Sequence, residues 1–472
     1  MDRYLKLFLM IILLIVISTL IVCNSPTKES ISQQTFTELA PTPPMGWNSW
    51  DSFGMDITDD QVKSVADYMA RYMKNFGWKY IVVDMGWYYG EGLNTNNFRM
   101  KNPPQYIDEF GRLIPSPRKF PSASNGQGLR PLSDYVHSLG LKFGVHIMRG
   151  IPRQAVEKNT PVKGTKYWAK DIVSYADTAT WYHGMYGVDM SKPGAQDYYN
   201  SLIELYSEWG VDYIKADDEI RPYRIEEIQG ISSAIKKSTR PIVLSLSAGP
   251  SPVSEIEHFR TNANLWRISG DLWDNWKFLK PAFELCREWQ TYVQPNHWPD
   301  LDMLPLGKLR INGTDGMLAN AIKKRNEETI NEYSRLSLDE KYTLLTLWII
   351  FRSPLMMGGN LLENDELTLQ LLTNDEVLAV NQNSINNHEL KAFDGEIVWV
   401  ADDPVSGAKY VALFNIDDQK DLDIEVSWEE LSISGDYTVR DLWKKINIGK
   451  FSNNISASVP PHGARLYKLT KL

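Results

Sequence analysis

Short apolar runs that can form strands alternate with helix-length stretches between residues 41 and 385. Examples are the run Tyr80–Val83, which precedes a helical stretch at Pro131–Leu139, and the run Val211–Lys215, which precedes one at Ile225–Lys237. Strands that alternate with helices form parallel βαβ units. A region of about 345 residues is within the size range of a (β/α)₈ barrel with long loops. The sequence therefore predicts an α/β fold, a TIM barrel.

The pattern changes over residues 386–472, where short alternating runs dominate. These runs are Ile397–Ala401, Lys409–Asn415, Leu422–Val426, Tyr437–Asp441, Ile455–Val459 and Ala464–Leu469. Closely spaced runs of this kind predict a small antiparallel β-sandwich. A chain of 472 residues is also too long for one hydrophobic core. We therefore expect a barrel domain followed by a C-terminal β-sandwich domain.

Residues 1–23 have the form of an export signal. A basic start precedes an apolar run, Leu7–Val22, that is short for a membrane span. The run ends in Leu-Ile-Val-Cys, which resembles the lipobox of bacterial lipoproteins, so Cys23 is a candidate lipidation site. A simple export signal and an uncleaved anchor are the alternatives. We expect an exported bacterial protein, periplasmic or anchored to a membrane by lipid, with a flexible polar linker at 24–40.

Charge and motif content narrow the class of function. The net charge is -9, and an acidic protein repels phosphate backbones, so we expect no nucleic-acid partner. The sequence contains no HExxH motif, no GxSxG motif and no Gly-rich phosphate loop. We therefore expect no cofactor and no catalytic metal. A metal cluster formed by the run Asp217-Asp218-Glu219 stays open as an alternative. The sequence does not predict an oligomeric state.

Acidic and aromatic residues follow several predicted strands. In a (β/α)₈ barrel the carboxyl ends of the strands meet at one face, where active sites form. The segments concerned are MGWNSWD at 45–51, VDMGW at 83–87, YIKADDE at 213–219 and WRISGDLWD at 266–274. Asp217 and Asp271 are 54 positions apart, close to two βα units of roughly 30 residues each. Both carboxylates can therefore face one pocket.

Two carboxyl groups at one pocket are the requirement of glycoside hydrolysis. One must be protonated to donate to the leaving oxygen, and the other must be ionised to attack the sugar. Lys215 is two residues before Asp217 and shares its face of the strand, so it should lower the pKa of that carboxyl. Asp217 is the predicted nucleophile and Asp271 the predicted acid/base. The alternative is that each Asp only caps a helix or binds a loop.

Seven segments carry a resemblance to a known family. They are PPMGWNSWDSFG, VVDMGW, LGLKFGVHI, YIKADD, WRISGDLWDNW, HWPDLDML and SPLMMGGNL, in that order. Together they resemble glycoside hydrolase family 27, the α-galactosidases or melibiases, over about residues 43–383. The resemblance implies a retaining exo-glycosidase that acts without a metal on terminal α-D-galactosyl residues of oligosaccharides or polysaccharides. It also implies a C-terminal β-sandwich.

The resemblance also assigns roles by position. Asp217 corresponds to the family's nucleophile and Asp271 to its acid/base. The substrate-binding residues that it implies are Trp50, Asp84, Met85, His146, Lys215, Arg267 and Met303. The segment 88–127 is expected to shape the aglycone side of the site.

Met85 is the departure that bears on the substrate. The family usually has a second acid here, and the two acids bind the 4- and 6-hydroxyls of galactose. A thioether is a weak acceptor, and an unpaired buried hydroxyl costs about 1–3 kcal/mol. β-L-Arabinopyranose is α-D-galactose without its exocyclic CH₂OH, and a family member with Ile at this position resembles a β-L-arabinopyranosidase. α-Galactosidase is the predicted activity and β-L-arabinopyranosidase the alternative.

Other departures lie nearby. His146 stands where the family usually has Tyr, the run Ser245–Pro250 stands where it has Glu-Trp, and Glu219 occupies the place of a usual Cys. A non-catalytic carbohydrate-binding lipoprotein is a further alternative.

Overall fold

The computed structural model describes residues 39–93, 99–179, 181–309 and 333–472. The predicted export signal, the lipidation site Cys23 and residues 24–38 of the predicted linker lie outside these ranges. Within them, no helix combines the length and the apolar character that a membrane crossing requires.

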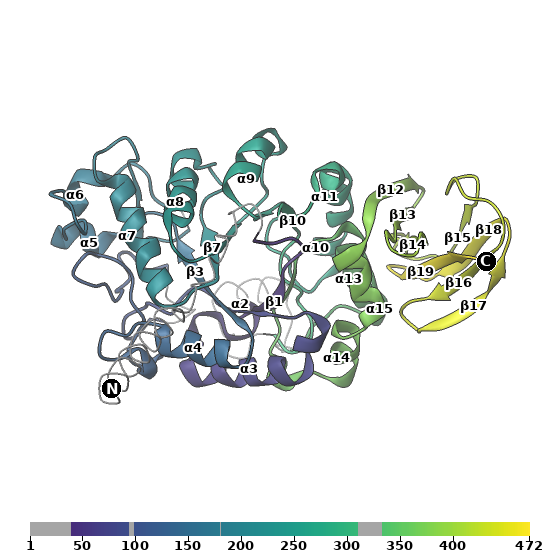
Figure 1. Ribbon diagram of the computed structural model, residues 1–472, viewed down its shortest axis with the longest axis horizontal. Helices are drawn as coiled ribbons and strands as arrows, with labels where there is room; N and C mark the ends of the chain where they lie inside the picture. Colours follow the sequence, from purple (N-terminus) through teal and green to yellow (C-terminus); the bar gives the residue numbers. More distant parts are fainter. Residues whose placement is uncertain (1–38, 94–98, 180, 310–332) are drawn as a thin grey trace, which may run out of the picture. The chain divides into compact units, whose positions relative to one another are not determined.

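An eight-stranded parallel sheet forms the first domain (Figure 1). Its strands lie in the order β10-β9-β8-β7-β3-β2-β1-β11. Their bounds are β1 Met45–Asn48, β2 Tyr80–Val83, β3 Lys142–Met148, β7 Tyr213–Asp217, β8 Val243–Leu246, β9 Leu265–Arg267, β10 Trp298–Asp300 and β11 Leu355–Met357. A parallel bridge between Leu304 and Met357 joins the two ends of the sheet. The prediction of a (β/α)₈ barrel is confirmed.

Helices follow the strands along this domain. They are α2 Trp50–Phe53, α3 Asp59–Tyr72, α4 Arg130–Ser138, α7 Ala195–Glu208, α8 Ile225–Lys237, α9 Ile256–Asn262, α10 Trp276–Leu279, α11 Ala282–Trp289, α13 Leu338–Phe351, α14 Glu366–Leu372 and α15 Asp375–Asn383. Strands β1, β2 and β8 are buried along their whole length, and burial on both faces explains why β2 appears in the sequence as a continuous apolar run. Reciprocal side-chain bonds between Thr58 and Gln61 fix the start of α3.

The segment between β3 and α7 contains a small excursion that the sequence did not predict. It consists of β4 Ile151–Pro152, α5 Arg153–Lys158, α6 Ala169–Ile172, β5 Val173–Ser174 and β6 Met185–Val188. The three strands form their own sheet in the order β4-β6-β5. Strands of two to four residues are too short to show a period in the sequence.

The second domain is a β-sandwich. Its larger sheet has the order β12-β13-β14-β19-β16-β17, and the smaller one pairs β15 with β18. The bounds are β12 Ile385–Phe393, β13 Glu396–Asp402, β14 Lys409–Asn415, β15 Leu422–Ser427, β16 Tyr437–Asp441, β17 Ile446–Phe451, β18 Asn454–Val459 and β19 Ala464–Lys471. The predicted sandwich is confirmed. The sequence analysis missed β12 and β17, which are edge strands with no buried residue.

Helix α13 lies against the larger sheet of the sandwich (Figure 1). The helix is apolar on nearly all sides, as is typical of a helix buried between two layers. Phe351 at its end packs edge-on against Trp399 of β13, and Thr343 donates a hydrogen bond to the carbonyl of His462.

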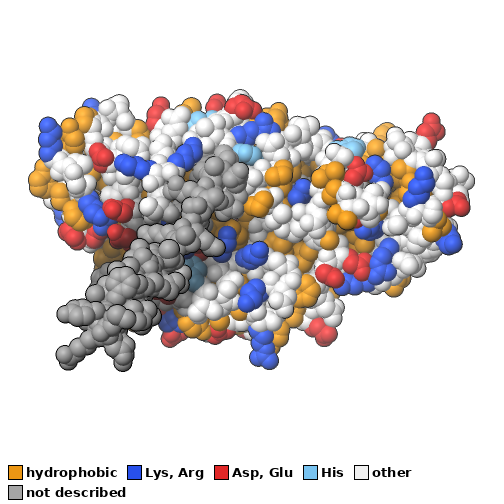
Figure 2. Space-filling view, in the orientation of Figure 1, with side chains coloured by type: hydrophobic (Ala, Val, Ile, Leu, Met, Phe, Trp, Pro, Cys, Tyr) orange, Lys and Arg blue, Asp and Glu red, His pale blue; other side chains and the backbone are white. Residues whose placement is uncertain are grey.

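On the face shown in Figure 2, acidic and basic side chains are interspersed over the surface.

Arg352 fixes the chain between the two domains. Its guanidinium donates to the carbonyl oxygens of Asn381 (2.8 Å), Gln382 (3.0 Å) and Ser384 (2.5 Å) at the end of α15. The last carbonyls of a helix have no partner within the helix. Arg352 is buried and also lies over the ring of Trp298, 4.9 Å from its centroid. One side chain therefore satisfies three backbone acceptors that would otherwise be unpaired.

We expect Arg352→Ala to lower the free energy of unfolding by about 3 kcal/mol, because it leaves these buried carbonyls without donors. Chemical denaturation followed by tryptophan fluorescence measures the change. Arg352→Lys keeps the charge but not the three-way geometry, and should lose less. An alanine variant that unfolds at the wild-type denaturant concentration would contradict this role.

Candidate active site

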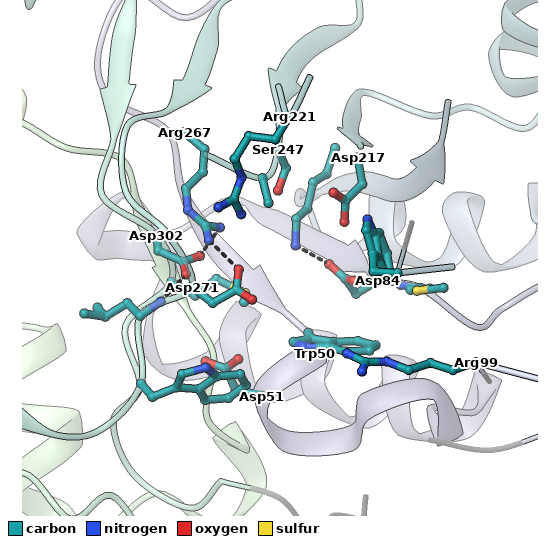
Figure 3. Close-up of a pocket in the computed structure, with 17 residues that line it drawn as sticks. Trp50, Asp51, Asp84, Arg99, Asp217, Arg221, Ser247, Arg267, Asp271 and Asp302 are labelled. Atoms are coloured by element: carbon teal, nitrogen blue, oxygen red, sulfur yellow. Dashed lines mark hydrogen bonds and ion pairs between the residues drawn. The ribbon is translucent and has the colours of Figure 1, made fainter. Parts of the chain in front are cut away.

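A pocket of about 260 Å³ opens at the carboxyl ends of the barrel strands (Figure 3). This volume is just below the roughly 300–1,000 Å³ of pockets for drug-sized ligands, and suits a smaller group such as one sugar ring. Eight of the nine residues predicted for the site line it, namely Trp50, Asp84, Met85, Lys215, Asp217, Arg267, Asp271 and Met303. Asp217 ends β7 and Asp271 follows β9, with β8 between them, as the spacing predicts.

His146 is the ninth predicted residue, and it lies behind the pocket wall. It is fully buried on β3, next to β7 in the sheet. Its Nε2 lies 3.0 Å from Oδ2 of Asp217. The structure thus brings His146 to the predicted nucleophile rather than to the pocket surface. Its Nδ1 has no hydrogen-bond partner in the described part of the chain.

Asp84 is held by three donors. Lys215 Nζ and Asn48 Nδ2 donate to Oδ2 at 2.8 and 2.7 Å, and the backbone N–H of Met85 donates to Oδ1 at 2.8 Å. Burial acts to raise the pKa of Asp84, but Lys215 and His146 more than offset it and hold the pKa well below its usual value. The direct partner of Lys215 is therefore Asp84, and not Asp217 as the strand spacing suggested.

Asp217 accepts two hydrogen bonds from other groups. His146 contacts Oδ2, and the backbone N–H of Asp218 donates to Oδ1 at 2.7 Å. Burial acts to raise its pKa, whereas His146, the charge of Lys215 and the Asp218 N–H lower it below the usual range. The charge of Lys215 therefore lowers the pKa of Asp217 as the sequence predicted, but His146 lowers it more. Asp217 is ionised at neutral pH.

Asp271 lies in a more open place than Asp217. Its side chain is 55% exposed, compared with 14% for Asp217. Arg267 Nη2 donates to its Oδ1 at 2.9 Å. Figure 3 shows Asp217 and Asp271 facing the same space, with the ring of Trp50 below them. One carboxylate is therefore deep in the pocket and the other is at its mouth.

Asp302 is a site residue that the sequence analysis did not single out. It is buried, forms an ion pair with Arg267 Nη1, and accepts the backbone N–H of Leu272 at 2.8 Å. Burial acts to raise its pKa and Arg267 opposes that rise. The segment HWPDLDML contained the signal, because Asp302 directly precedes the predicted Met303.

The other lining residues were also missed. They are Asp51, Arg99, Trp181, Arg221, Ser247, Ala248, Leu272 and Trp273. Most of these lie inside or beside segments that the sequence analysis examined. Arg99 lies in the segment 88–127, which was expected beside the site, although no pattern singled out this residue. Trp181 lies in a loop without a recognisable pattern, so the sequence could not have placed it.

The run Asp217-Asp218-Glu219 points its three carboxyl groups to different surroundings. Asp217 lines the pocket, and Asp218 accepts from Trp181 Nε1 at 2.9 Å and lies beside Arg149. Glu219 is fully buried, and burial raises its pKa well above its usual value. Among the residues that the structure describes, no three His, Cys, Asp or Glu side chains are placed to hold a metal ion.

Family models match both domains. The model described as "Alpha galactosidase A" matches residues 42–187 and 154–322, and the one described as "Alpha galactosidase C-terminal beta sandwich domain" matches residues 394–469. The chain belongs to glycoside hydrolase family 27, the melibiase family. The resemblance seen in the sequence is thereby confirmed, and the protein is a glycoside hydrolase. This assignment replaces the alternative of a non-catalytic binding protein.

Curated relatives align over most of the chain. Alpha-galactosidase 2 of Arabidopsis thaliana is 28% identical, over 92% of this chain and 90% of its own. The alpha-galactosidase of Cyamopsis tetragonoloba is also 28% identical, over 92% and 87%. Both alignments include the barrel and the sandwich.

Solved structures extend the comparison. A family 27 β-L-arabinopyranosidase of Geobacillus stearothermophilus, solved in complex with arabinose, is 45% identical, with a TM-score of 0.87 over 93% of this chain and 99% of that one. A Bacillus halodurans protein, for which α-N-acetylgalactosaminidase activity is only proposed, is 42% identical, with a TM-score of 0.79 over 91% and 97%.

We expect His146→Phe to move the acid limb of the pH profile of kcat/KM to higher pH. The folded protein holds the pKa of Asp217 below its usual value, so its carboxylate is lost only when the pH falls through that lowered value. Removing the His146 contact raises the pKa, and protonation then occurs at higher pH. His146→Gln keeps an N–H donor and should move the limb less. If folded His146→Phe keeps the wild-type acid limb of kcat/KM, then His146 does not control the pKa of Asp217.

Proposed function

We propose that the protein is a retaining exo-glycosidase that removes terminal sugars with the ring configuration of α-D-galactose, and that β-L-arabinopyranosides are its preferred substrates. The observation that carries the substrate preference is Met85, which is 2% exposed and lines the pocket directly after Asp84. The natural substrate would be an oligosaccharide or polysaccharide that ends in such a sugar.

The proposed mechanism has two displacements. Asp217 attacks the anomeric carbon while Asp271 gives its proton to the leaving oxygen, which forms a covalent glycosyl-enzyme. Asp271 then removes a proton from water as the water attacks the same carbon, and the configuration is retained. The lowered pKa of the deep carboxylate supports the nucleophilic role of Asp217. The exposure of Asp271 at the mouth of the pocket fits a group that exchanges protons with the leaving group and with water.

Charged contacts would bind the sugar around these two groups. Asp84 and Lys215 form one buried pair in the pocket wall, and Arg267 with Asp302 forms another. Each pair is already oriented without substrate, so little reorganisation is needed when sugar hydroxyls bind. The ring of Trp50 supplies an apolar face below the sugar position.

Met85 favours a sugar without an exocyclic hydroxymethyl group. A thioether cannot donate a hydrogen bond and accepts only weakly. The 6-hydroxyl of galactose next to it would lose a bond to water, whereas arabinopyranose has no such hydroxyl. The 45% identity with the Geobacillus β-L-arabinopyranosidase supports the same preference. α-D-Galactosides are the second candidate, because the curated relatives are α-galactosidases.

The cellular location stays a prediction from the sequence. Export, with Cys23 as a possible lipid anchor, would place the enzyme where polysaccharide fragments are met.

We expect Asp217→Gly to lose hydrolysis almost completely and to be rescued by azide, because the small anion can fill the space left by the carboxylate. NMR should identify the product as a glycosyl azide of inverted configuration, formed by a single displacement. The Asp271→Gly variant is the comparison, since azide attacks its glycosyl-enzyme without needing a general base and should give a glycosyl azide of retained configuration. Substantial hydrolysis by Asp217→Gly without azide would overturn the nucleophile assignment.

We expect wild-type kcat/KM to be higher for p-nitrophenyl β-L-arabinopyranoside than for the α-D-galactopyranoside. Met85→Asp should shift the ratio toward the galactoside by roughly 5- to 150-fold, the equivalent of about 1–3 kcal/mol for one buried hydrogen bond. Met85→Leu keeps an apolar side chain of similar size and should retain the arabinoside preference. Faster cleavage of p-nitrophenyl N-acetyl-α-D-galactosaminide than of either substrate would contradict both candidates.

A further inference from the structure

We propose that Arg149 is a positioning residue, which fixes the carboxylate of Asp217 by holding Asp218 in an unusual backbone conformation. Arg149 directly follows β3 and does not line the pocket. The inference rests on the proposed role of Asp217 as nucleophile.

Arg149 contacts the chain on both sides of the Asp217–Asp218 peptide. Its backbone N–H donates to the carbonyl oxygen of Asp217 at 3.1 Å. Its Nε donates to the carbonyl oxygen of Asp218 at 2.8 Å and lies 2.9 Å from Oδ2 of the same residue. The position of Asp218 is therefore defined by a main-chain contact and a charged contact from one residue.

Asp218 has a φ of 68°, in the left-handed region. A non-glycine residue adopts this region at a cost, although Asp tolerates it better than most. The N–H of Asp218 belongs to the Asp217–Asp218 peptide and donates to Oδ1 of Asp217 at 2.7 Å. With the positive φ, the carbonyl and the carboxylate of Asp218 both lie on the Arg149 side chain, while the Arg149 N–H holds the carbonyl of Asp217. Arg149 thereby anchors this peptide on both sides, in the orientation in which its N–H faces the nucleophile and helps to keep it ionised.

Every nitrogen of the Arg149 guanidinium donates a hydrogen bond. Nη1 donates to Glu227 Oε1 at 2.9 Å and to Asp177 Oδ2 at 3.0 Å, and Nη2 donates to Asp177 Oδ1 at 2.8 Å. Only 3% of the side chain is exposed, and burial acts to lower the pKa of Arg149 while Glu227, Asp218 and Asp177 raise it overall. The planar fork can therefore reach Asp218 in one orientation only, which a lysine could not reproduce.

Asp218 also contacts the pocket wall. Asp218 Oδ1 accepts from Nε1 of Trp181, and Trp181 lines the pocket. A shift of Asp218 would therefore move the nucleophile and one aromatic wall together. Displacement of a reacting group by about 1 Å can cost roughly 100-fold in rate.

The test compares Arg149→Gln with a control from the same ion cluster. Arg224 Nη2 pairs with Asp177 Oδ1 at 2.7 Å, so Arg224→Gln removes a cation from the cluster without removing a contact to Asp218. Both variants are made in the full chain, and kcat, KM, the pH profile and thermal unfolding are measured with the better of the two p-nitrophenyl substrates. Active enzyme is counted by trapping with a 2-fluoro glycosyl fluoride.

For Arg149→Gln we expect kcat per active site to fall about 100-fold, with KM changed by less than about threefold. The acid limb of kcat/KM should also move to higher pH, because Asp217 loses the ordered N–H that stabilises its charge. Arg224→Gln should keep the wild-type limb and most of kcat, even where both variants lose thermal stability. Arg149→Lys should lie between Arg149→Gln and the wild type.

If Arg149→Gln does not fold, the double variant Arg149→Gln/Glu227→Gln takes its place. It removes one buried charge of each sign, so that no unpaired charge is left by the loss of Arg149 from this ion pair. The same drop in kcat and the same shift of the limb are expected. The inference would be overturned by a folded single or double variant that keeps the wild-type kcat and the wild-type acid limb of kcat/KM. It would also be overturned if Arg224→Gln moved the acid limb as far as Arg149→Gln does. If Asp217→Gly gives no glycosyl azide, the proposed function itself fails. If it does and the limb stays in place, only the role of Arg149 fails.

Discussion

Burial of charge is the constraint that organises this site. Ions removed from water require partners, because the desolvation of an unpaired ion is not otherwise offset. Lys215 is paired with Asp84, and Arg267 is shared between Asp302 and Asp271. Asp217 is stabilised by His146 and a backbone N–H instead of a cation of its own. The pairing leaves each group with its orientation fixed before any sugar arrives.

The barrel makes these pairings possible, since it brings together residues that are far apart in sequence. Asp84 and Lys215 are 131 positions apart and meet because β2 and β7 flank β3. The same order places His146 of β3 against Asp217 of β7. A change in strand order would separate every one of these pairs, so the chemistry depends on the topology as much as on the residue types.

The sequence was sufficient for the architecture and for the two carboxylates. Periodicity predicted the barrel strands that carry Asp84 and Asp217, since buried parallel strands are continuous apolar runs. It could not predict that Lys215 would pair with Asp84, because pairing across strands depends on register. The positive φ of Asp218 and its contact with Arg149 were also out of reach, since both follow from tertiary packing. Edge strands such as β17 were missed because they bury little.

The apolar helix α13 has a consequence for how the two domains relate as folding units. Its side chains belong to one continuous core with Trp399, Phe414 and Leu466 on one face of the larger sandwich sheet. The opposite face of that sheet forms a separate cluster with the smaller sheet. The seam between the domains is therefore interior rather than surface. If relatives exchanged their C-terminal domains, the incoming sandwich would therefore have to come with an α13 whose side chains match it.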